Sequence, residues 1–140
     1  MADPGVLWLT DQDYRRLKDV LDVQVRQSRT LASELQSLEN LLDLARIVRS
    51  EAIPQNVVTM NSRVVFRDLG TGSEETVTIT YPAEAHPSSG RISVLSPVGT
   101  ALVGATEGQE IGLPLPHGNR RNIRIESVVY QPEAEGHFAL

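Results

Sequence analysis

Two different patterns of hydrophobic and polar positions divide the chain. From residue 10 to residue 52 there is no Gly or Pro, and helix-favouring Leu, Gln, Arg and Glu dominate. From residue 53 onward, short β-rich runs alternate with Gly, Pro, Asn and Ser, which are strand and turn signals. The patterns predict a helical region over 1–52 and a separate β-rich domain over 53–140.

The helical region contains apolar positions at coiled-coil spacing. We expect a first helix over 10–27, where Thr10 and Asp13 make a capping box and Leu9 and Tyr14 occupy the positions of a hydrophobic staple. Thr30 is placed to cap a second helix. The second segment follows the alternating four-and-three spacing of a coiled-coil seam: Leu31, Leu35, Leu38, Leu42 and Ala45. The first segment answers less regularly with Tyr14, Leu17, Leu21 and Val25.

The link between the two segments decides between two architectures. Either they form one helix of about 40 residues that dimerises through the seam, or they fold back near Ser28 as an antiparallel hairpin. The apolar stripe is weak between residues 24 and 30, and this favours the hairpin. Its tip would then consist of Arg26, Gln27, Ser28, Arg29 and Thr30.

The β-rich region predicts an antiparallel sheet with one short helix. RVVFRD (63–68) and TVTITY (76–81) alternate in polarity around a Gly-containing turn, and further strands are expected at 91–95, 110–114 and 122–130, with HGN (117–119) as the last turn. In SPVGTALVG, Ser96 is a helix cap, Pro97 suits the first helical position and Gly104 suits the left-handed position after the helix. The expected fold class is α+β, a helical hairpin (short coiled coil) followed by this sheet domain.

Composition narrows the classes of function. The net charge of -5 argues against direct nucleic-acid binding, which depends on clusters of Lys and Arg. Without cysteine the chain has no disulfide, thiolate metal site or thiol nucleophile, and this suits the reducing cytoplasm. The early apolar run VLWL is too short for a signal or membrane segment, so we expect neither export nor membrane insertion.

Candidate chemical groups are sparse, and we expect no enzyme activity, cofactor or metal. The three histidines lie apart in Pro- or Gly-containing stretches typical of solvated loops: His86, His117 and His137. The glycines in 70–72 and 99–108 lack the strand–loop–helix signature of a phosphate cradle. The charges of the first helix are interpreted as a solvated face: Arg15, Arg16 and Lys18, balanced by Asp11, Asp13, Asp19 and Asp22.

The segment ISVLSPVGTALVGATEGQEI (92–111) resembles the Gre family of bacterial transcript-cleavage factors. Six residues fall on the family's Ser-Pro motif: Ser96, Pro97, Ala101, Leu102, Gly104 and Gly108. Residues 53–140 are similar in more detail to the Rnk branch of that family, through VVTMNSRVVFRDL (57–69), YPAE (81–84), SVLSPVG (93–99) and YQPEAEG (130–136). The resemblance implies an FKBP-like fold for the β domain; over 1–52 it concerns the architecture alone.

The resemblance also implies a partner. In the Gre family the β domain docks on the rim of the secondary channel of RNA polymerase and the hairpin enters the channel. The docking role carries over to Leu95, Ser96 and Pro97, although classical Gre factors often have an acidic residue where this chain has Leu95. The expected protein is a monomer that binds RNA polymerase.

The hairpin tip separates this chain from cleavage-active Gre factors, which carry acidic residues there to help hold a second Mg²⁺. Mg²⁺ needs carboxylate oxygens within direct reach, whereas the predicted tip has none. Asp22 and Glu34 lie six residues from Ser28, roughly 9 Å back along each helix. We therefore expect a regulator that competes with Gre factors without stimulating transcript cleavage.

Two alternatives from other classes remain open. An FKBP-like prolyl isomerase would need an aromatic-lined apolar cleft, for which the β region offers Phe66, Tyr81, Tyr130 and Phe138. A structural coiled-coil dimer with a continuous helix predicts twice the monomer mass in solution.

Overall fold

A computed structural model describes residues 6–27, 32–114 and 120–137, without the side chains of 25–27, 32–34, 114 and 120. The helices are α1 (Asp11–Gln27), α2 (Ala32–Leu44) and α3 (Pro97–Leu102), with short 3-10 turns η1 (Ser50–Ala52), η2 (Pro82–Glu84), η3 (Pro87–Ser89) and η5 (Glu133–Glu135). The strands are β1 (Trp8–Thr10), β2 (Arg46–Val48), β3 (Arg63–Asp68), β4 (Glu74–Thr80), β5 (Arg91–Ser93), β6 (Glu110–Pro114) and β7 (Arg120–Tyr130). The α+β class expected from the sequence is confirmed.

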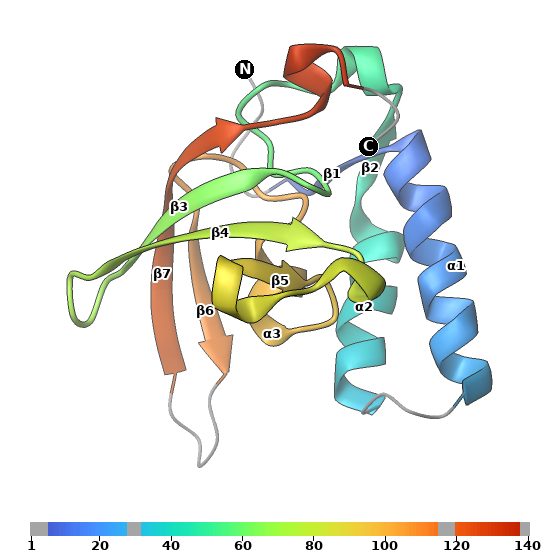
Figure 1. Cartoon of the computed structure of the whole chain (residues 1–140), viewed down its shortest axis with the longest axis horizontal. Helices are drawn as coiled ribbons and strands as arrows, with labels where there is room; N and C mark the ends of the chain where they lie inside the picture. The colour runs from blue at the N-terminus through green and yellow to red at the C-terminus, as the bar shows by residue number, and fades with distance from the viewer. Residues whose placement is uncertain (1–5, 28–31, 115–119, 138–140) are drawn as a thin grey trace.

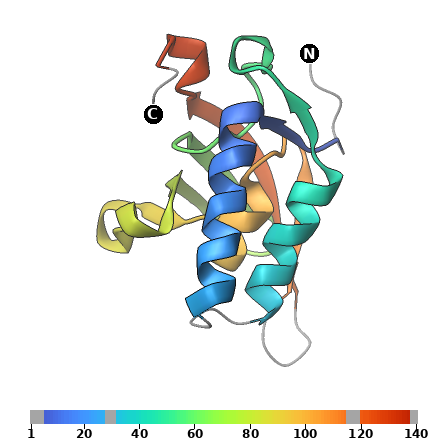
Figure 2. The ribbon, with the colours of Figure 1, turned by 90° about the vertical axis from the view of Figure 1, so that its right-hand side faces the viewer.

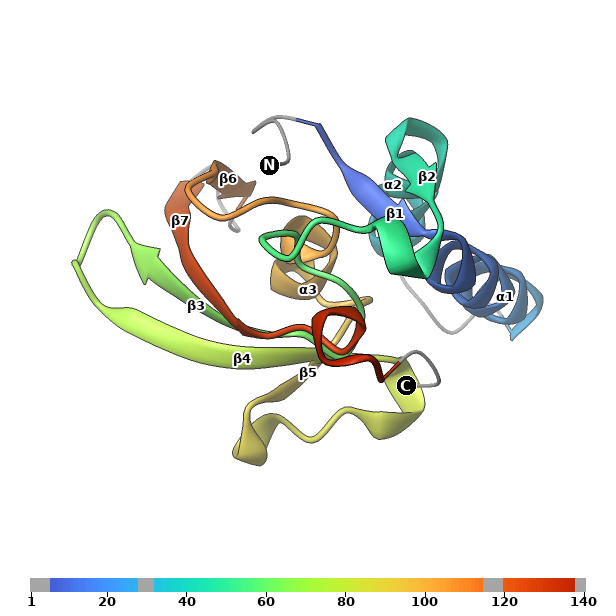
Figure 3. The same ribbon diagram turned by 90° about the horizontal axis from the view of Figure 1, so that it is seen from above.

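The larger sheet has the strand order β5-β4-β3-β7-β6 and curls around α3 (Figures 1 and 3). The antiparallel pairing predicted for RVVFRD and TVTITY is present, since β3 and β4 are antiparallel with Val64 opposite Val77. One pairing differs from the expected antiparallel sheet, because β5 runs parallel to β4. The segment that contains η2 and η3 carries the chain back before β5 begins, so β5 enters the sheet in the same direction as β4.

The concave face of this sheet holds the core. Val64 and Phe66, two residues apart in β3, are fully buried, as the alternating pattern predicts. Leu102 of α3 is also fully buried and belongs to the same core. Thr80, which the pattern assigned to the wet face, is buried, and its hydroxyl donates to the carbonyl of Ile92 at 3.2 Å.

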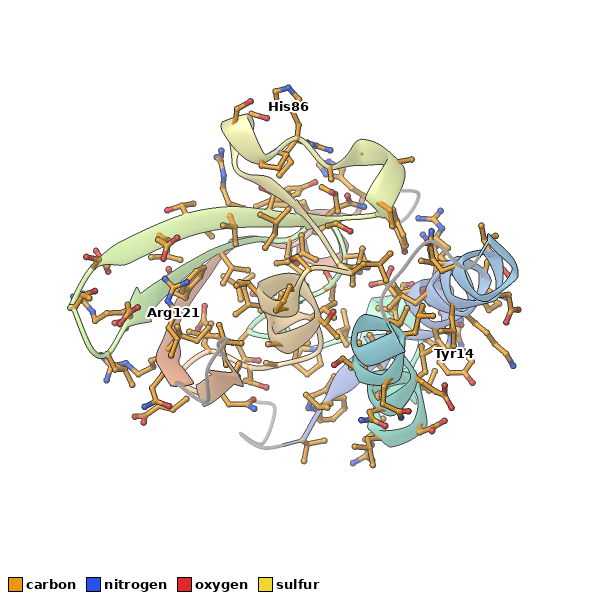
Figure 4. The ribbon with its side chains drawn as sticks, turned by 90° about the horizontal axis from the view of Figure 1, so that it is seen from below. Tyr14, His86 and Arg121 are labelled. Atoms are coloured by element: carbon orange, nitrogen blue, oxygen red, sulfur yellow. The ribbon has the colours of Figure 1, made fainter. Side chains whose placement is uncertain are left out.

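Arg121 closes the core at the far end of β3 and β7, where Figure 4 labels it. Its guanidinium lies 5.6 Å from the centroid of the Phe66 ring, and its Nε donates to Asp68 Oδ2 at 2.7 Å. Arg121 also pairs with Glu75. The hydrogen bond from Arg121 holds the pKa of Asp68 below its ordinary value.

α1 and α2 are separate helices that lie side by side (Figures 1 and 2). Leu17 of α1 and Leu38 and Leu42 of α2 are buried, as the seam predicts. Leu41 is buried as well, although it falls outside the predicted seam, because α2 also packs against α3. The predicted tip residues Ser28, Arg29 and Thr30, and Leu31 of the seam, lie outside the described residues, as do the side chains of Arg26 and Gln27.

The strands that flank the two helices form a second, two-stranded sheet that the sequence pattern did not predict. β1 pairs in parallel with β2, with Leu9 opposite Ile47. The guanidinium of Arg46 lies 5.2 Å from the centroid of the Trp8 ring. This sheet joins the beginning of α1 to the end of α2.

The helices and the sheet domain share one hydrophobic core. Leu17, Leu38 and Leu41 belong to the same buried cluster as residues of the large sheet, so the core crosses the boundary predicted at 52/53. The amide of Trp8 donates to the carbonyl of Gly104 at 2.9 Å. Gly104 has a φ of +87°, and a Cβ there would lie 3.3 Å from Leu41 Cδ1, so the glycine permits this close approach. α1 and α2 are therefore packed against the sheet domain.

Candidate functional site

The loop before α3 carries the residues expected to contact a partner. Ser96 caps the helix as predicted, because its Oγ accepts a hydrogen bond from the amide of Gly99 at 3.1 Å. The same hydroxyl donates to the carbonyl of Ser93 at 2.7 Å. The carbonyl of Ser96 in turn accepts from the hydroxyl of Thr100 at 3.1 Å. These bonds fix the Ser-Pro turn from both sides.

The three predicted contact residues differ in their exposure to solvent. Pro97 is exposed, Ser96 is half-buried, and Leu95 retains 9% of its accessible surface because its side chain lies in the core. Gly99 packs so tightly beneath the turn that a Cβ would lie 2.2 Å from the carbonyl oxygen of Ser93. The solvent-facing surface of this turn is therefore Pro97 together with part of Ser96.

The acidic residues of the helices do not form a metal site in the described part of the chain. Asp22 is exposed on α1, and the side chain of Glu34 lies outside the described residues. Across the described ranges, no three side chains of the types that bind metals come together.

The prediction that the charged residues of α1 form a solvated face is wrong for Asp13, which is buried. Its backbone amide donates to Thr10 Oγ1 at 3.0 Å, which is one half of the predicted capping box. Its carboxylate, however, is buried, and Oδ2 accepts from the amide of Met60 at 3.1 Å. Burial, with a smaller contribution from the charge of Glu133, raises the pKa of Asp13 to about 7.

The neighbours of Asp13 come from distant segments. The hydroxyl of Tyr81 donates to Asp13 Oδ1 at 3.4 Å, and the guanidinium of Arg16 lies 6.0 Å from the centroid of the Tyr81 ring. Glu133 accepts from the hydroxyl of Thr59 at 2.7 Å. Burial, followed by the charge of Asp13, raises the pKa of Tyr81. This cluster, Asp13 with Met60, Tyr81 and Glu133, brings α1 together with residues that precede β3, follow β4 and follow β7.

An open cleft of about 790 Å³ begins beside this cluster. It is lined by polar and charged residues from α1, the β3 and β4 strands, the β5 edge and the end of β7: Arg16, Asp19, Asn61, Arg63, Thr78, Tyr81, Glu84, Arg91 and Tyr130. Sequence reasoning missed it, because these residues are scattered along the chain. The alternation in β3 placed Arg63 on the outer face, which is the one signal that pointed to this side of the sheet.

The described histidines are loop residues, as expected. His86 is exposed beyond η2, and Figure 4 shows it at the outer end of that loop, with Nδ1 2.7 Å from Ser89 Oγ. His137 is exposed near the C-terminus, with Nδ1 2.7 Å from the Tyr130 hydroxyl. His117 lies outside the described residues. Within the described segments, no helix combines the length and the apolar character needed to span a membrane.

Comparison with known proteins places this fold. Residues 53–130 match the family model described as "Transcription elongation factor, GreA/GreB, C-term". The chain is 36% identical to the regulator of nucleoside diphosphate kinase of Escherichia coli K12 over 140 residues, which is 100% of both chains. It is 37% identical over 92 residues to GreA of Listeria welshimeri, or 66% of this chain and 57% of that one.

A solved structure agrees with the sequence comparison. A GreA/GreB transcription elongation factor from Nitrosomonas europaea has a TM-score of 0.71 and 37% identity, covering 90% of this chain and 99% of that one. The match therefore includes both the helices and the sheet domain. The chain belongs to the GreA/GreB family of transcription elongation factors, in the branch that includes the regulator of nucleoside diphosphate kinase.

Proposed function

We propose that this protein is a non-catalytic regulator that binds RNA polymerase at the rim of the secondary channel. The sheet domain docks through Ser96 and Pro97, and α1 and α2 act as a short antiparallel hairpin that occupies the channel entrance. Bound there, the protein excludes Gre-type factors by mass action without stimulating transcript cleavage. Membership of a transcription elongation factor family is the observation that carries this proposal.

Two features of the structure support docking at the Ser-Pro turn. Pro97 is exposed at the first position of α3, and its backbone is held by the hydrogen bonds of Ser96. A surface that is already fixed loses little conformational freedom on binding. Leu95 packs in the core and has little exposed surface to offer RNA polymerase. Its direct contact with the polymerase stays a prediction.

The attachment of the helices supports a fixed direction of entry. The bonds from Trp8 to Gly104 and from Met60 to Asp13, together with the shared core, hold α1 and α2 against the sheet domain. A docked domain would therefore set the position of the helices without a hinge. The absence of carboxylates between residues 26 and 30 supports a role that lacks the second Mg²⁺.

The aromatic residues give the prolyl isomerase alternative no support. Phe66 is buried in the core, while Tyr81 and Tyr130 line a charged cleft. Phe138 lies outside the described residues. An isomerase site needs an apolar cleft with its aromatic faces available, and these three described rings do not provide one. We therefore propose no enzyme activity.

The test is a competition on stalled elongation complexes, with and without a cleavage-active Gre factor, in which RNA length is followed. The protein alone should cause no cleavage and should suppress cleavage by the Gre factor. Pro97→Glu should abolish the suppression, whereas Pro87→Glu, at another exposed proline that begins a short helix, should retain it. Cleavage by the protein alone, or equal suppression by both variants, would contradict the proposal.

A further inference from the structure

Four residues form a row across the outer face of the large sheet. Arg91 of β5 is the register partner of Thr78 in β4, Thr78 is the partner of Arg63 in β3, and Arg63 is the partner of Tyr130 in β7. All four line the cleft beside α1. Residues directly opposite each other on neighbouring strands share a face, and the strands lie about 4.8 Å apart. The two arginines therefore flank the threonine hydroxyl from backbone positions about 10 Å apart.

The opposite wall of the cleft adds a third cation. Arg16 on α1 lies over the face of Tyr81, and both residues line the cleft. The volume of about 790 Å³ suits a small molecule, since such sites measure roughly 300–1,000 Å³. The cleft thus has a floor of arginine, threonine and tyrosine from the sheet and a wall from the first helix.

The charges of the cleft depart from those of the whole chain. The lining contains three arginines and two acids, Asp19 and Glu84, whereas the chain has a net charge of -5. The side chain of Arg63 has no hydrogen bond or ion pair with any other described residue, whereas those of Arg16 and Arg91 have partners. Arg91 Nη2 lies 3.6 Å from Glu84 Oε2, and their side chains are 42% and 56% exposed. Arg91 Nε also donates to the carbonyl of Glu84 at 3.4 Å. Both contacts are long and exposed, so an anion in the cleft would compete with them for Arg91 at little cost.

We propose that this cleft binds the pyrophosphate group of a small molecule. Arg63 and Arg91 approach the two phosphoryl groups from either side, and the hydroxyl of Thr78 donates a hydrogen bond between them. Guanidinium groups match phosphate oxygens with paired N–H donors, and two such groups two strands apart match two linked phosphates better than one isolated anion. Tyr130, next to Arg63 in the row, offers a ring surface for the rest of the ligand.

None of the residues of the Ser-Pro turn lines this cleft, and the proposal holds whether or not the protein binds RNA polymerase. A ligand in the cleft would touch both α1 and the sheet, so it would also strengthen the attachment of the helices. Two kinds of ligand carry a pyrophosphate group, inorganic pyrophosphate and a nucleoside diphosphate. Adenosine diphosphate, pyrophosphate and adenosine, used as separate probes, distinguish them.

The test is isothermal titration calorimetry on the full chain at low salt. Both phosphorylated probes should bind, and their affinity should fall at 0.3 M salt as ion pairs are screened. Tighter binding of adenosine diphosphate identifies a nucleotide-like ligand, whereas equal affinities identify free pyrophosphate. Arg63→Gln should weaken binding at least tenfold, and Thr78→Val should weaken it less. Arg49→Gln, which removes the same charge from a side chain that is 82% exposed outside the cleft, should leave affinity unchanged.

Thermal unfolding with each probe checks that the variants are folded before binding is compared. Arg63 is exposed, so Arg63→Gln should unfold within a few degrees of the parent in the absence of ligand. Three results would overturn the proposal: no binding of either phosphorylated probe at millimolar concentration, equal affinity of the Arg63 and Arg49 variants, or binding of adenosine as tight as that of adenosine diphosphate.

Discussion

Asp13 in the first turn of α1 accepts a hydrogen bond from the backbone amide of Met60, 47 residues further along the chain, at 3.1 Å. This bond joins the helices to the segment that leads into β3. The carboxylate is buried in the folded protein and solvated in the unfolded chain, so folding disfavours its charged form. The same contact that fixes the helix therefore makes its attachment sensitive to pH.

The first prediction concerns Asp13→Asn. The folded-state pKa of about 7 lies above the ordinary value of 3.8, so the contribution of Asp13 to stability is fully present at low pH. That contribution falls as pH rises from about 4 through 7, by on the order of 4 kcal/mol for a shift of this size. Asparagine retains an acceptor for Met60 without a charge. The variant should therefore lose less stability than the parent between pH 5 and 8.5 in urea unfolding experiments.

Asp11→Asn is the matched control, because Asp11 is exposed in the same helical turn. It should show the same pH dependence as the parent protein. Parallel pH profiles for the parent and Asp13→Asn would show that the buried carboxylate does not titrate in this range.

The second prediction concerns the cap of α3. Ser96→Ala removes the acceptor for the amide of Gly99 and the donor to the carbonyl of Ser93. Loss of a serine cap costs about 1 kcal/mol of unfolding free energy. Ser73→Ala in the exposed β3–β4 loop should change stability by less than about 0.5 kcal/mol. Urea unfolding of the two variants measures the difference, and equal stabilities would show that the cap is dispensable.

The third prediction concerns Gly99, where the close approach of two backbone segments leaves no room for a methyl group. A Cβ at this position would lie 2.2 Å from the carbonyl oxygen of Ser93, so the backbone must move in Gly99→Ala. We expect a loss of about 2 kcal/mol or more, as in overpacked cores. Gly70→Ala, where the nearest atom is the Asp68 Oδ1 of an exposed loop at 3.2 Å, should cost less. Thermal unfolding distinguishes the two, and a stable Gly99 variant would contradict the tight turn.

The fourth prediction concerns acid stability. Arg121 lowers the pKa of Asp68, so the stabilisation from Asp68 is present above its ordinary pKa and is lost as pH falls through the lowered value. Asp68→Asn should destabilise the protein at pH 7 and should flatten the decline in stability below about pH 4. Glu51→Gln, at a carboxylate 59% exposed beside Arg49, should keep the parent's acid profile. Circular dichroism during acid titration measures both, and identical profiles would exclude a role for the Arg121 pair.

The elements that the sequence predicted well are those set by local rules. The alternation that buries Val64 and Phe66 follows from the pleat of a single strand, and the bounds of β3 match the prediction. The cap at Ser96 and the left-handed Gly104 follow from contacts within a few residues. The hydrophobic stripe likewise predicted the burial of Leu38.

The features that the sequence did not predict depend on partners far along the chain. An aspartate in the first turn of a helix is ordinarily solvated, and the sequence around Asp13 contains no pattern that predicts its contacts with Met60 and Tyr81. The three-residue strands β1 and β2 are too short for a periodic signal and are stabilised by each other. The cleft needs the register of four strands, so Arg63 and Arg91 gain a common role only when the sheet is assembled.

The hydrogen bond from Trp8 to Gly104 has a consequence for biosynthesis. The ribosome releases the segment that forms β1 and α1 before its partners, because Met60 lies 47 residues after Asp13 and Gly104, the partner of Trp8, lies later still. Contacts between residues so distant in sequence slow folding, since a long loop must close before they form. Until those partners have emerged, the apolar side chains of the nascent helices stay uncovered. Chaperone capture or premature self-association would occur in that interval.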